Sequence, residues 1–426
     1  MSDAIFFQQV TVVPGDGTGP RVADVLWSDG KWHFPAAPPT SGIRSVPCEG
    51  RILLPGLFDF DAHLREPGRE DAETLATGAA AAIAGGFTGL LLMPDTSPPV
   101  DNPGMVRSVL DMAARQSPIP MAAAGCLSKG RAGQELAEIG GMLREGARLF
   151  TDDPDPVTSP VLLRRALQYA RDLGGLVATF GDVRELSSGG TMHDGAVSCS
   201  LGLPGLHPCA EEIGLARDLR LAQSCGGRLH ILHVTTAEGV ATLRRYKQAG
   251  LAVTAGVTPH HLVLTDAAVG DYRTACKVRP PLRPASDTAA LLEALADGTI
   301  DVIATDHSPH TEFEKQRDFA SAPFGTTGLE TALPVLHDRF IRTGQLDWTT
   351  LVARFATAPR RILGLPEPVI ADGSEANAVL FDPRKPTLVD PATFRSKGRH
   401  SPFSGQSLEG SITAVMLGHR LLLDRI

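Results

Sequence analysis

Residues 55–68 read Pro55-Gly56-Leu57-Phe58-Asp59-Phe60-Asp61-Ala62-His63-Leu64-Arg65-Glu66-Pro67-Gly68. An apolar run precedes them, and the Pro-Gly turn signal leads into a segment that we expect to be extended. Side chains two positions apart on a strand point to the same face, so Asp61 and His63 are expected to converge on one spot. Both residue types bind metal ions, although Asp-x-His spacing alone is a weak signal for a metal site. The interpretation therefore depends on the rest of the chain.

Apolar, strand-like runs alternate with helical patterns through the middle of the chain, which is typical of a parallel sheet covered by helices. Eight such runs lie at residues 52–60, 87–93, 121–126, 147–150, 176–180, 229–234, 252–257 and 302–305. Between them, helical periodicity is clearest at residues 71–84, 162–172 and 210–225. Eight parallel strands close a barrel, so the predicted fold class is α/β, with a TIM (β/α)8 barrel.

Titratable residues follow six of these runs, at the end where such a barrel places its chemistry. They are Asp61 and His63, Asp95, Asp153, His233, His260 and His261, and Asp306 and His310. Histidines scattered through a core would not give this pattern, so it predicts an active site. We interpret His260 and His261 as scaffolding, and His230 as a core residue, because its odd spacing from His233 turns it to the other face of a strand. Two Pro- and Gly-rich loops, 96–103 and 311–324, are expected to be lids or substrate loops.

The two ends of the chain have a different texture, with short β-like runs and no helical periodicity. At the N-terminal end these runs lie at residues 5–13, 22–27 and 31–34, and at the C-terminal end at 378–382, 411–417 and 420–423. We expect both ends to pair into one small β-sandwich domain of residues 1–52 and 365–426. The barrel would then comprise residues 53–364.

The bulk composition argues against several classes of partner. The net charge is −8 at pH 7 and no Lys/Arg-rich run occurs, so nucleic acid is not an expected partner. The only long apolar window, 75–93, is interrupted by glycines and threonines, and the N-terminus lacks the pattern of a secretory signal, so we expect no membrane span and a cytoplasmic location. The six cysteines contain no C-x-x-C pair and are interpreted as reduced thiols.

The stretch 55–68 resembles the signature of the dihydroorotases, cyclic amide hydrolases of the amidohydrolase superfamily, which usually read Pro-Gly-Leu-Ile-Asp-x-His-x-His-Leu-Arg-Glu-Pro-Gly. Later motifs continue the resemblance in the family order: Met93-Pro94-Asp95-Thr96, Phe150-Thr151-Asp152-Asp153, His230-Ile231-Leu232-His233-Val234, Thr258-Pro259-His260-His261-Leu262, Pro280-Pro281-Leu282-Arg283, Thr305-Asp306-His307-Ser308-Pro309-His310 and Ala322-Pro323-Phe324-Gly325. The resemblance implies the barrel and a small β-domain built from both ends of the chain. It also implies a role in de novo pyrimidine biosynthesis, the interconversion of dihydroorotate and N-carbamoyl-aspartate.

The family uses a two-zinc centre built from the His-x-His pair, a bridging carboxylate, two further histidines and an aspartate that is also the general base. By resemblance, the members retained here are His63, Asp153 as the bridge, His233, and Asp306 as ligand and catalytic base. Asp152 is the alternative bridge. Substrate contacts would come from Arg65, which would hold the substrate carboxylate, and from His310, Phe324 and Gly325.

Two ligand positions depart from the family pattern. Asp61 stands where the first histidine of the pair is expected, and Phe180 stands where the family has a histidine after the fifth strand. Phenylalanine offers a metal no lone pair, so a closed two-zinc site is not expected. We predict one zinc ion at most, with Asp61, His63, Asp153, His233 and Asp306 as the candidate ligands, or none.

Two substrate positions depart from it as well. Asp95 and Arg279 each replace a family asparagine, and Asp95 would place a carboxylate beside an anionic substrate. We expect both residues at the substrate site, where they could form an ion pair that plugs the pocket. Without metal, Arg65 and Arg279 could instead neutralise the clustered carboxylates.

These departures lead to two hypotheses. In the first, the chain is a degenerate dihydroorotase, impaired or inactive, that persists as a partner of aspartate transcarbamoylase, the preceding enzyme, and forms a homo-oligomer. In the second, it is an active mononuclear zinc hydrolase of a cyclic amide, either dihydroorotate or a less acidic hydantoin-like ring.

Overall fold

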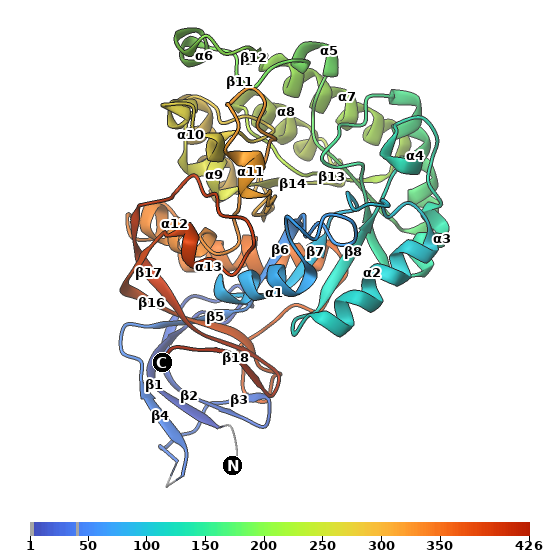
Figure 1. Cartoon of the computed structure of the whole chain (residues 1–426). Coiled ribbons are helices and arrows are strands. Elements are labelled where there is room, and N and C mark those ends of the chain that lie inside the picture. The colour runs from blue at the N-terminus through green and yellow to red at the C-terminus, as the bar shows by residue number, and fades with distance from the viewer. Residues whose placement is uncertain (1–3, 40–41) are drawn as a thin grey trace.

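The computed structural model describes residues 4–39 and 42–426, and a parallel β-barrel surrounded by helices forms its larger part (Figure 1). Its strands pair in parallel in chain order: β6 Leu57–Ala62, β7 Phe87–Leu92, β8 Met121–Gly125, β9 Ala147–Phe150, β10 Leu176–Thr179, β13 Arg228–Ile231, β14 Val253–Val257 and β15 Val302–Ile303. The two ends of this sheet meet where the His63 amide donates to the His307 carbonyl at 2.9 Å. The barrel is therefore nearly closed, and the predicted (β/α)8 fold is confirmed.

Helices cover the outside of the barrel and begin at recognisable caps. The N-cap side chains of Thr74, Asn102 and Ser159 each accept a backbone N–H of the first turn. The longer helices are α1 Leu75–Ala84, α2 Pro103–Gln116, α3 Ile139–Arg144, α4 Pro160–Leu173, α7 Cys209–Cys225, α8 Ala237–Gln248 and α10 Ala285–Asp297. Shorter elements line the connections: α5 Arg184–Ser187, β11 Met192–His193, α6 Ala196–Leu201, β12 Gly205–Leu206, α9 Pro259–Val263, α11 Glu312–Lys315, α12 Ala332–Leu336, α13 Trp348–Val352 and α14 Ala358–Ile362. None of the helices in the described part of the chain is both long and apolar enough to cross a membrane.

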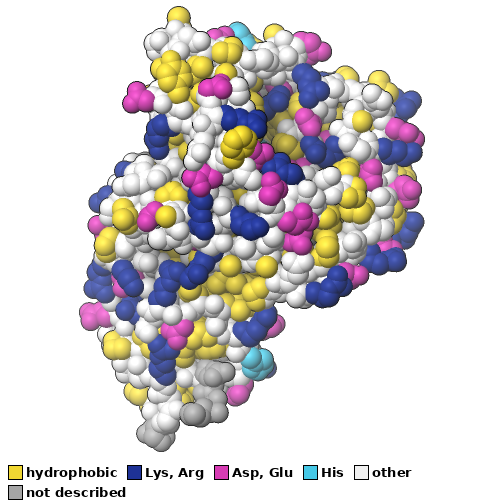
Figure 2. All heavy atoms as spheres, in the orientation of Figure 1, with side chains coloured by type: hydrophobic (Ala, Val, Ile, Leu, Met, Phe, Trp, Pro, Cys, Tyr) yellow, Lys and Arg dark blue, Asp and Glu magenta, His cyan; other side chains and the backbone are white. Residues whose placement is uncertain are grey.

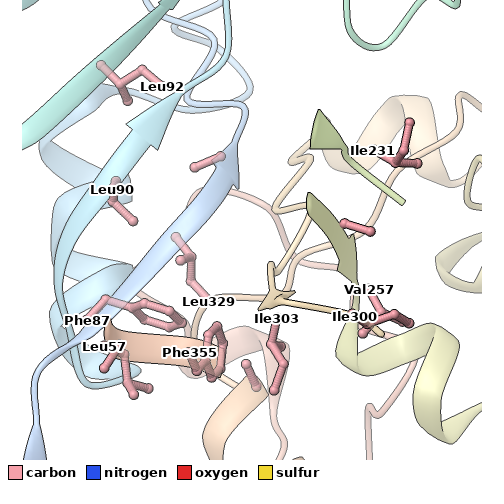
Figure 3. Close-up of a cluster of buried hydrophobic side chains, with 14 of the residues drawn as sticks. Leu57, Phe87, Leu90, Leu92, Ile231, Val257, Ile300, Ile303, Leu329 and Phe355 are labelled. Atoms are coloured by element: carbon pink, nitrogen blue, oxygen red, sulfur yellow. The ribbon is translucent and has the colours of Figure 1, made fainter. Parts of the chain in front are cut away.

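Two apolar layers explain why the barrel strands are apolar on both faces. In β7, Leu90 and Leu92 face the helices, where they lie in one cluster with Phe87 and Ile303 (Figure 3). The alternate residue Leu91 belongs to the cluster that fills the barrel interior. A strand covered on both sides has no polar face, which is why the sequence shows continuous apolar runs rather than alternation.

The two ends of the chain form a separate mixed sheet at the lower end of Figure 1. Its strands are β1 Ile5–Val12, β2 Arg21–Ser28, β3 Lys31–His33, β4 Arg44–Pro47, β5 Ile52–Pro55, β16 Asn377–Leu388, β17 Ser407–Leu417 and β18 Arg420–Asp424. The order β18-β17-β16-β5-β1-β2-β3, with β4 beside β1, joins both termini. The sheet curves so far that Trp27 Nε1 in β2 donates to the Gly418 carbonyl after β17, 3.0 Å away. A small core of its own includes Trp27, Trp32 and Leu53.

The first predicted apolar run, 52–60, divides between the two sheets. Its first part is β5, which pairs with β1 and β16, and the barrel strand β6 starts only after Gly56. The predicted boundary between residues 52 and 53 cuts through β5, so we propose Gly56 as the junction. A Cβ at Gly56 would lie 2.2 Å from both Thr88 Oγ1 and Asn377 Oδ1, so only glycine fits between barrel and sheet.

The loop between β16 and β17 reaches from the small sheet to the mouth of the barrel. There Glu73 accepts hydrogen bonds from the Ser396 hydroxyl and, at 3.1 Å, from the Lys397 amide, and it lies 3.3 Å from His307 Nε2. The His400 carbonyl accepts from the Thr327 amide at 3.2 Å. The small domain thus supports the segment next to Asp306.

Candidate functional site

The mouth of the barrel brings together all five side chains that the sequence predicts as metal ligands. Asp61 is the last residue but one of β6 and His63 follows that strand, while Asp153, His233 and Asp306 follow β9, β13 and β15. Each of the five is buried. Parallel strands end at one face of the barrel, and for this reason residues far apart in sequence meet here.

Asp61 is the centre of this cluster. Its Oδ1 lies 3.3 Å from His63 Nε2, and its Oδ2 lies 3.1 Å from His233 Nε2. His63 Nε2 is also 3.1 Å from Asp153 Oδ2 and 3.7 Å from Asp306 Oδ1. The cluster contains two groups of three residues, and within each group the ligand atoms lie within 4.8 Å of one another. One group is Asp61, Asp153 and His233, and the other is Asp61, His63 and Asp306. Both groups contain Asp61, the residue that stands where the family pattern has a histidine.

The residues present fit a metal ion. Both Asp61 oxygens are buried, and neither has a correctly aligned hydrogen bond to any described residue, although ring nitrogens lie close by. A buried carboxylate without hydrogen bonds is unfavourable, whereas a cation between these carboxylates and imidazoles would satisfy them. Carboxylate and imidazole donors together suit zinc and similar divalent ions.

The protonation of the cluster reflects the same crowding of charges. Burial would raise the pKa of Asp61, but its contacts with His233 and His63 outweigh burial and lower that pKa to about 2. Burial likewise opposes the charge on His233, yet the Asp61 carboxylate raises the pKa of His233 to about 9. Burial raises the pKa of Asp306 to about 7, and the neighbouring Asp61 adds to this effect. Metal binding here would displace protons from the histidines.

The geometry separates the two candidates for the bridging carboxylate. Asp152 Oδ1 accepts the amides of Leu127 at 3.0 Å and Ser128 at 2.9 Å, and its Oδ2 accepts the Ser128 hydroxyl at 2.5 Å. These bonds hold the Asp152 side chain on the loop after β8. Asp153, and not Asp152, enters the cluster.

Phe180 is the residue after β10, where the family resemblance would place another histidine. It is buried and lines a cavity of about 20 Å³ together with Asp182, Arg279 and Glu211. Such a cavity has room for about one water molecule. The strand end that would complete a second metal site therefore carries a hydrocarbon ring and little free space.

Asp95, which follows β7, lies between His63 and Arg65. Its Oδ2 is 2.5 Å from Arg65 Nη1, and its Oδ1 is 2.9 Å from His63 Nδ1, a contact without the alignment of a hydrogen bond. Burial would raise the pKa of Asp95, but the charges of His63 and Arg65 hold it below its usual range. The arginine predicted to hold the substrate carboxylate thus already faces a carboxylate of the protein.

The prediction of an ion pair between Asp95 and Arg279 is wrong. Arg279 Nη2 lies 2.5 Å from Asp182 Oδ2 and donates to Ser187 Oγ at 3.4 Å. Asp182 lies just beyond Phe180 and lines the same small cavity as Arg279, whereas Asp95 is engaged by Arg65 and His63. Arg279 therefore does not neutralise Asp95; its partner is Asp182, beside the small cavity that Phe180 lines.

We expect this pair to stabilise the fold measurably. In a double-mutant cycle of Asp182→Asn and Arg279→Gln, urea unfolding should give a coupling energy of about 1.5 kcal/mol, because the Asp182 side chain is only 8% exposed. The surface pair Arg184 and Asp155, 3.2 Å apart with side chains 58% and 43% exposed, is the control and should give below about 0.5 kcal/mol. Equal coupling in both cycles would contradict this account.

The remaining predicted substrate residues also lie together, but they are bonded to the protein. His310 Nε2 is 2.8 Å from the Phe324 carbonyl, and the Gly325 amide donates to the Lys277 carbonyl at 2.9 Å. Gly325 has φ 127°, and a Cβ there would lie 2.9 Å from the Ser308 carbonyl oxygen. Burial, with the positive charges of Arg65 and Lys315, lowers the pKa of His310 to about 3.

The other histidines near the mouth pack as scaffolding. His261 Nε2 is 2.9 Å from the Pro280 carbonyl, its Nδ1 is 2.8 Å from Thr258 Oγ1, and burial lowers its pKa to about 3. His260 packs against it with ring centroids 4.5 Å apart. His230 stacks on Phe60 at 4.4 Å inside the barrel, which matches its interpretation as a core residue.

Several buried charged residues around the mouth were not predicted from the sequence, among them Glu73, Lys277 and Lys315. Glu73 links the loop between β16 and β17 to His307, and no sequence signal marks it. Lys277 lies just before Arg279 and the Pro-Pro-Leu-Arg motif, so its position could have attracted attention. The partners of both lysines are backbone carbonyls, which a sequence does not reveal.

Known proteins resemble this chain in sequence and in fold. The family model described as "Dihydro-orotase-like" matches residues 50–239. A dihydroorotase of Pelotomaculum thermopropionicum is 46% identical over 388 residues, which cover 91% of each chain. A dihydroorotase of Anaeromyxobacter dehalogenans is 42% identical over 99% of this chain and 98% of its own.

Solved structures show the same architecture. The L-hydantoinase (dihydropyrimidinase) of Arthrobacter aurescens superimposes with a TM-score of 0.86 at 23% identity, covering 100% of this chain and 97% of its own. At that identity the likeness concerns the fold alone. The curated relatives, together with the motifs at the barrel mouth, show the family directly: this chain belongs to the dihydroorotase family.

Proposed function

We propose that this chain is a one-zinc, dihydroorotase-family protein of de novo pyrimidine biosynthesis in which turnover of dihydroorotate is impaired or lost. The observation that carries the proposal is the pair Arg65 and Asp95, 2.5 Å apart with side chains only 11% and 4% exposed. Dihydroorotate carries a carboxylate, and a second carboxylate a few ångströms away opposes its binding by at least about 1 kcal/mol, even when screened by solvent. Asp95 therefore competes with the substrate for Arg65.

The candidate ligands of the single ion are Asp61, His63, Asp153, His233 and Asp306. A zinc ion supplies a Lewis acid for the ring carbonyl and lowers the pKa of a bound water. Asp306 would accept the proton, and the Asp95 carboxylate lies 2.9 Å from the second ring nitrogen of His63. Phe180 contributes no ligand, which supports one ion rather than two.

The altered residues lie at both the ligand and the substrate positions, while the barrel and the small domain are intact. A protein kept as a structural partner needs the fold but not the chemistry. We therefore propose that the protein forms a homo-oligomer in the cytoplasm and associates with aspartate transcarbamoylase. Co-expression of the two proteins followed by gel filtration should give one co-migrating species, and two separately migrating proteins would count against the association.

Ring opening is the direct test of impairment. With zinc supplied, the purified protein should open dihydroorotate no faster than its Asp306→Ala variant, because the substrate carboxylate meets Asp95 and the second metal position is absent. The change in absorbance of dihydroorotate would be followed for both proteins from the same host. A rate that is clearly present in the unchanged protein and absent in the variant would show a working dihydroorotase and would overturn the proposal.

The same ion pair favours one alternative function. Since Asp95 neutralises Arg65, a ring without a carboxylate meets no repulsion, and the one-zinc site could hydrolyse a neutral cyclic amide such as a hydantoin. Turnover of hydantoin or dihydropyrimidine, lost in Asp306→Ala, would select it over the impaired protein.

A further inference from the structure

Two buried lysines lie beside the loop that carries Phe324 and Gly325. Lys277 follows the 3-10 turn Thr274–Cys276, and Lys315 ends α11. Their exposed fractions are 3% and 6%, unusually low for lysine. Neither has a carboxylate within 4.0 Å among the residues that the structure describes. Their charges must be balanced in another way.

Backbone carbonyls of one short segment provide that balance. Lys277 Nζ donates to the carbonyls of Phe319, Ala320 and Ala322 at 2.8, 2.8 and 2.7 Å. Lys315 Nζ donates to the carbonyls of Pro323 and Gly325 at 3.0 and 2.8 Å. An ammonium group has three N–H donors, and each donor of Lys277 has a carbonyl acceptor. Most carbonyls of segment 319–325 are therefore held by two ammonium groups.

Lys277 also contacts the segment through its aromatic rings, and the two lysines repel one another. Lys277 Nζ lies 4.7 Å from the ring centroid of Phe324 and 5.6 Å from that of Phe319. Burial, with the charge of Lys277, lowers the pKa of Lys315 to about 7. Holding two like charges together out of water is unfavourable, so packing alone does not account for lysine at both positions.

The held segment leads directly to the predicted substrate contacts. The Gly325 amide donates to the Lys277 carbonyl at 2.9 Å, and Lys277 Nζ donates to the Phe319 carbonyl at 2.8 Å, so one residue holds both ends of the segment. The Phe324 carbonyl faces His310 Nε2 at 2.8 Å. A shift of the segment would therefore move Phe324 and Gly325 relative to His310.

We propose that Lys277 and Lys315 are positioning residues that fix segment 319–325 as a preset wall of the substrate pocket. This segment overlaps the loop 311–324, which the sequence predicts as a lid or substrate loop, and it is fastened rather than free to open. The role of the wall in ligand binding rests on the proposed function, whereas the fastening itself does not.

Hydrogen exchange measured by mass spectrometry tests the fastening without any need for activity. In Lys277→Met and Lys315→Met, peptides that cover residues 319–325 should exchange about 10-fold faster or more, because each substitution removes hydrogen bonds from a charged donor. Peptides from β7 and β13 should be unchanged. The control is Lys247→Met, since Lys247 Nζ pairs with Asp301 at 2.6 Å on the outside of the barrel. No acceleration in segment 319–325, or equal acceleration everywhere, would overturn the proposal.

Calorimetry on the zinc-loaded protein, titrated with N-carbamoyl-aspartate, tests whether the lysines position the wall for ligand binding or only stabilise the fold. The affinity should fall about 10-fold in each methionine variant, while Lys277→Arg, which keeps the charge, should bind within about 3-fold of the unchanged protein. Faster exchange with unchanged affinity would overturn the positioning role. No binding by the unchanged protein would overturn the positioning role but not the proposed function, in which Asp95 opposes the ligand; the exchange experiment would still decide whether the lysines fasten the segment.

Discussion

A variant with both Asp61→His and Phe180→His is expected to bind two zinc ions per chain, where the unchanged protein binds one. The two substitutions place imidazoles at the two positions where the ligand set of this chain is incomplete. Asp61 already lies 3.1 to 3.3 Å from His233 and His63, so an imidazole there would reach the same cluster. Phe180 is buried beside a cavity of only about 20 Å³, and the smaller imidazole ring fits its place.

Metal content after gel filtration, measured by mass spectrometry, would show the second ion. Phe180→Leu is the matched control, because it changes the volume at this position without adding a ligand, and it should retain one ion. Loss of the phenyl ring is expected to lower the free energy of unfolding by about 1 to 3 kcal/mol, so thermal unfolding should be recorded for each variant. A folded double variant that still binds one ion would show that Phe180 does not lie at a metal position.

The substitution Asp95→Asn is expected to strengthen binding of N-carbamoyl-aspartate about 10-fold. It keeps the shape of the side chain, removes the charge that faces Arg65 at 2.5 Å, and leaves the arginine free to pair with a carboxylate of the ligand. Removing a like charge a few ångströms from an anion is worth at least about 1 kcal/mol in solvent and more in a buried site, which approaches tenfold in affinity.

Calorimetry at two salt concentrations would measure this effect. Asp172→Asn is the control, since Asp172 is a surface residue with a side chain 64% exposed. It should leave the affinity within about 2-fold. Unchanged or weaker binding by Asp95→Asn would show that Asp95 supports the site through His63 and does not obstruct Arg65.

The sequence predicted the barrel and the meeting of the five candidate ligands because both follow from regular rules. Apolar runs mark strands that are covered on both faces, and residues after parallel strands meet at one end, which brings Asp61, His63, Asp153, His233 and Asp306 together. The division of the first run at Gly56 was not predicted, since two consecutive apolar strands in different sheets look like one long strand.

The partners of charged side chains were harder to predict. Arg279 has several carboxylates within reach along the chain, and sequence spacing does not show that Asp182 lies nearest while Asp95 is held by Arg65 and His63. The roles of Lys277 and Lys315 depend on carbonyls whose directions are set by the loop conformation. Such contacts become visible only in three dimensions.

We propose that Asp61 has replaced a histidine as ligand of a single metal ion. The test is the zinc content of the purified protein and of its Asp61→Asn variant, each measured after saturation with zinc and removal of free ion. We predict one zinc per chain in the unchanged protein and at least about 100-fold weaker binding in Asp61→Asn, since an amide cannot supply the charge of the carboxylate. A protein that stays metal-free under excess zinc, that holds two ions, or that binds zinc equally well without the Asp61 carboxylate would contradict the claim.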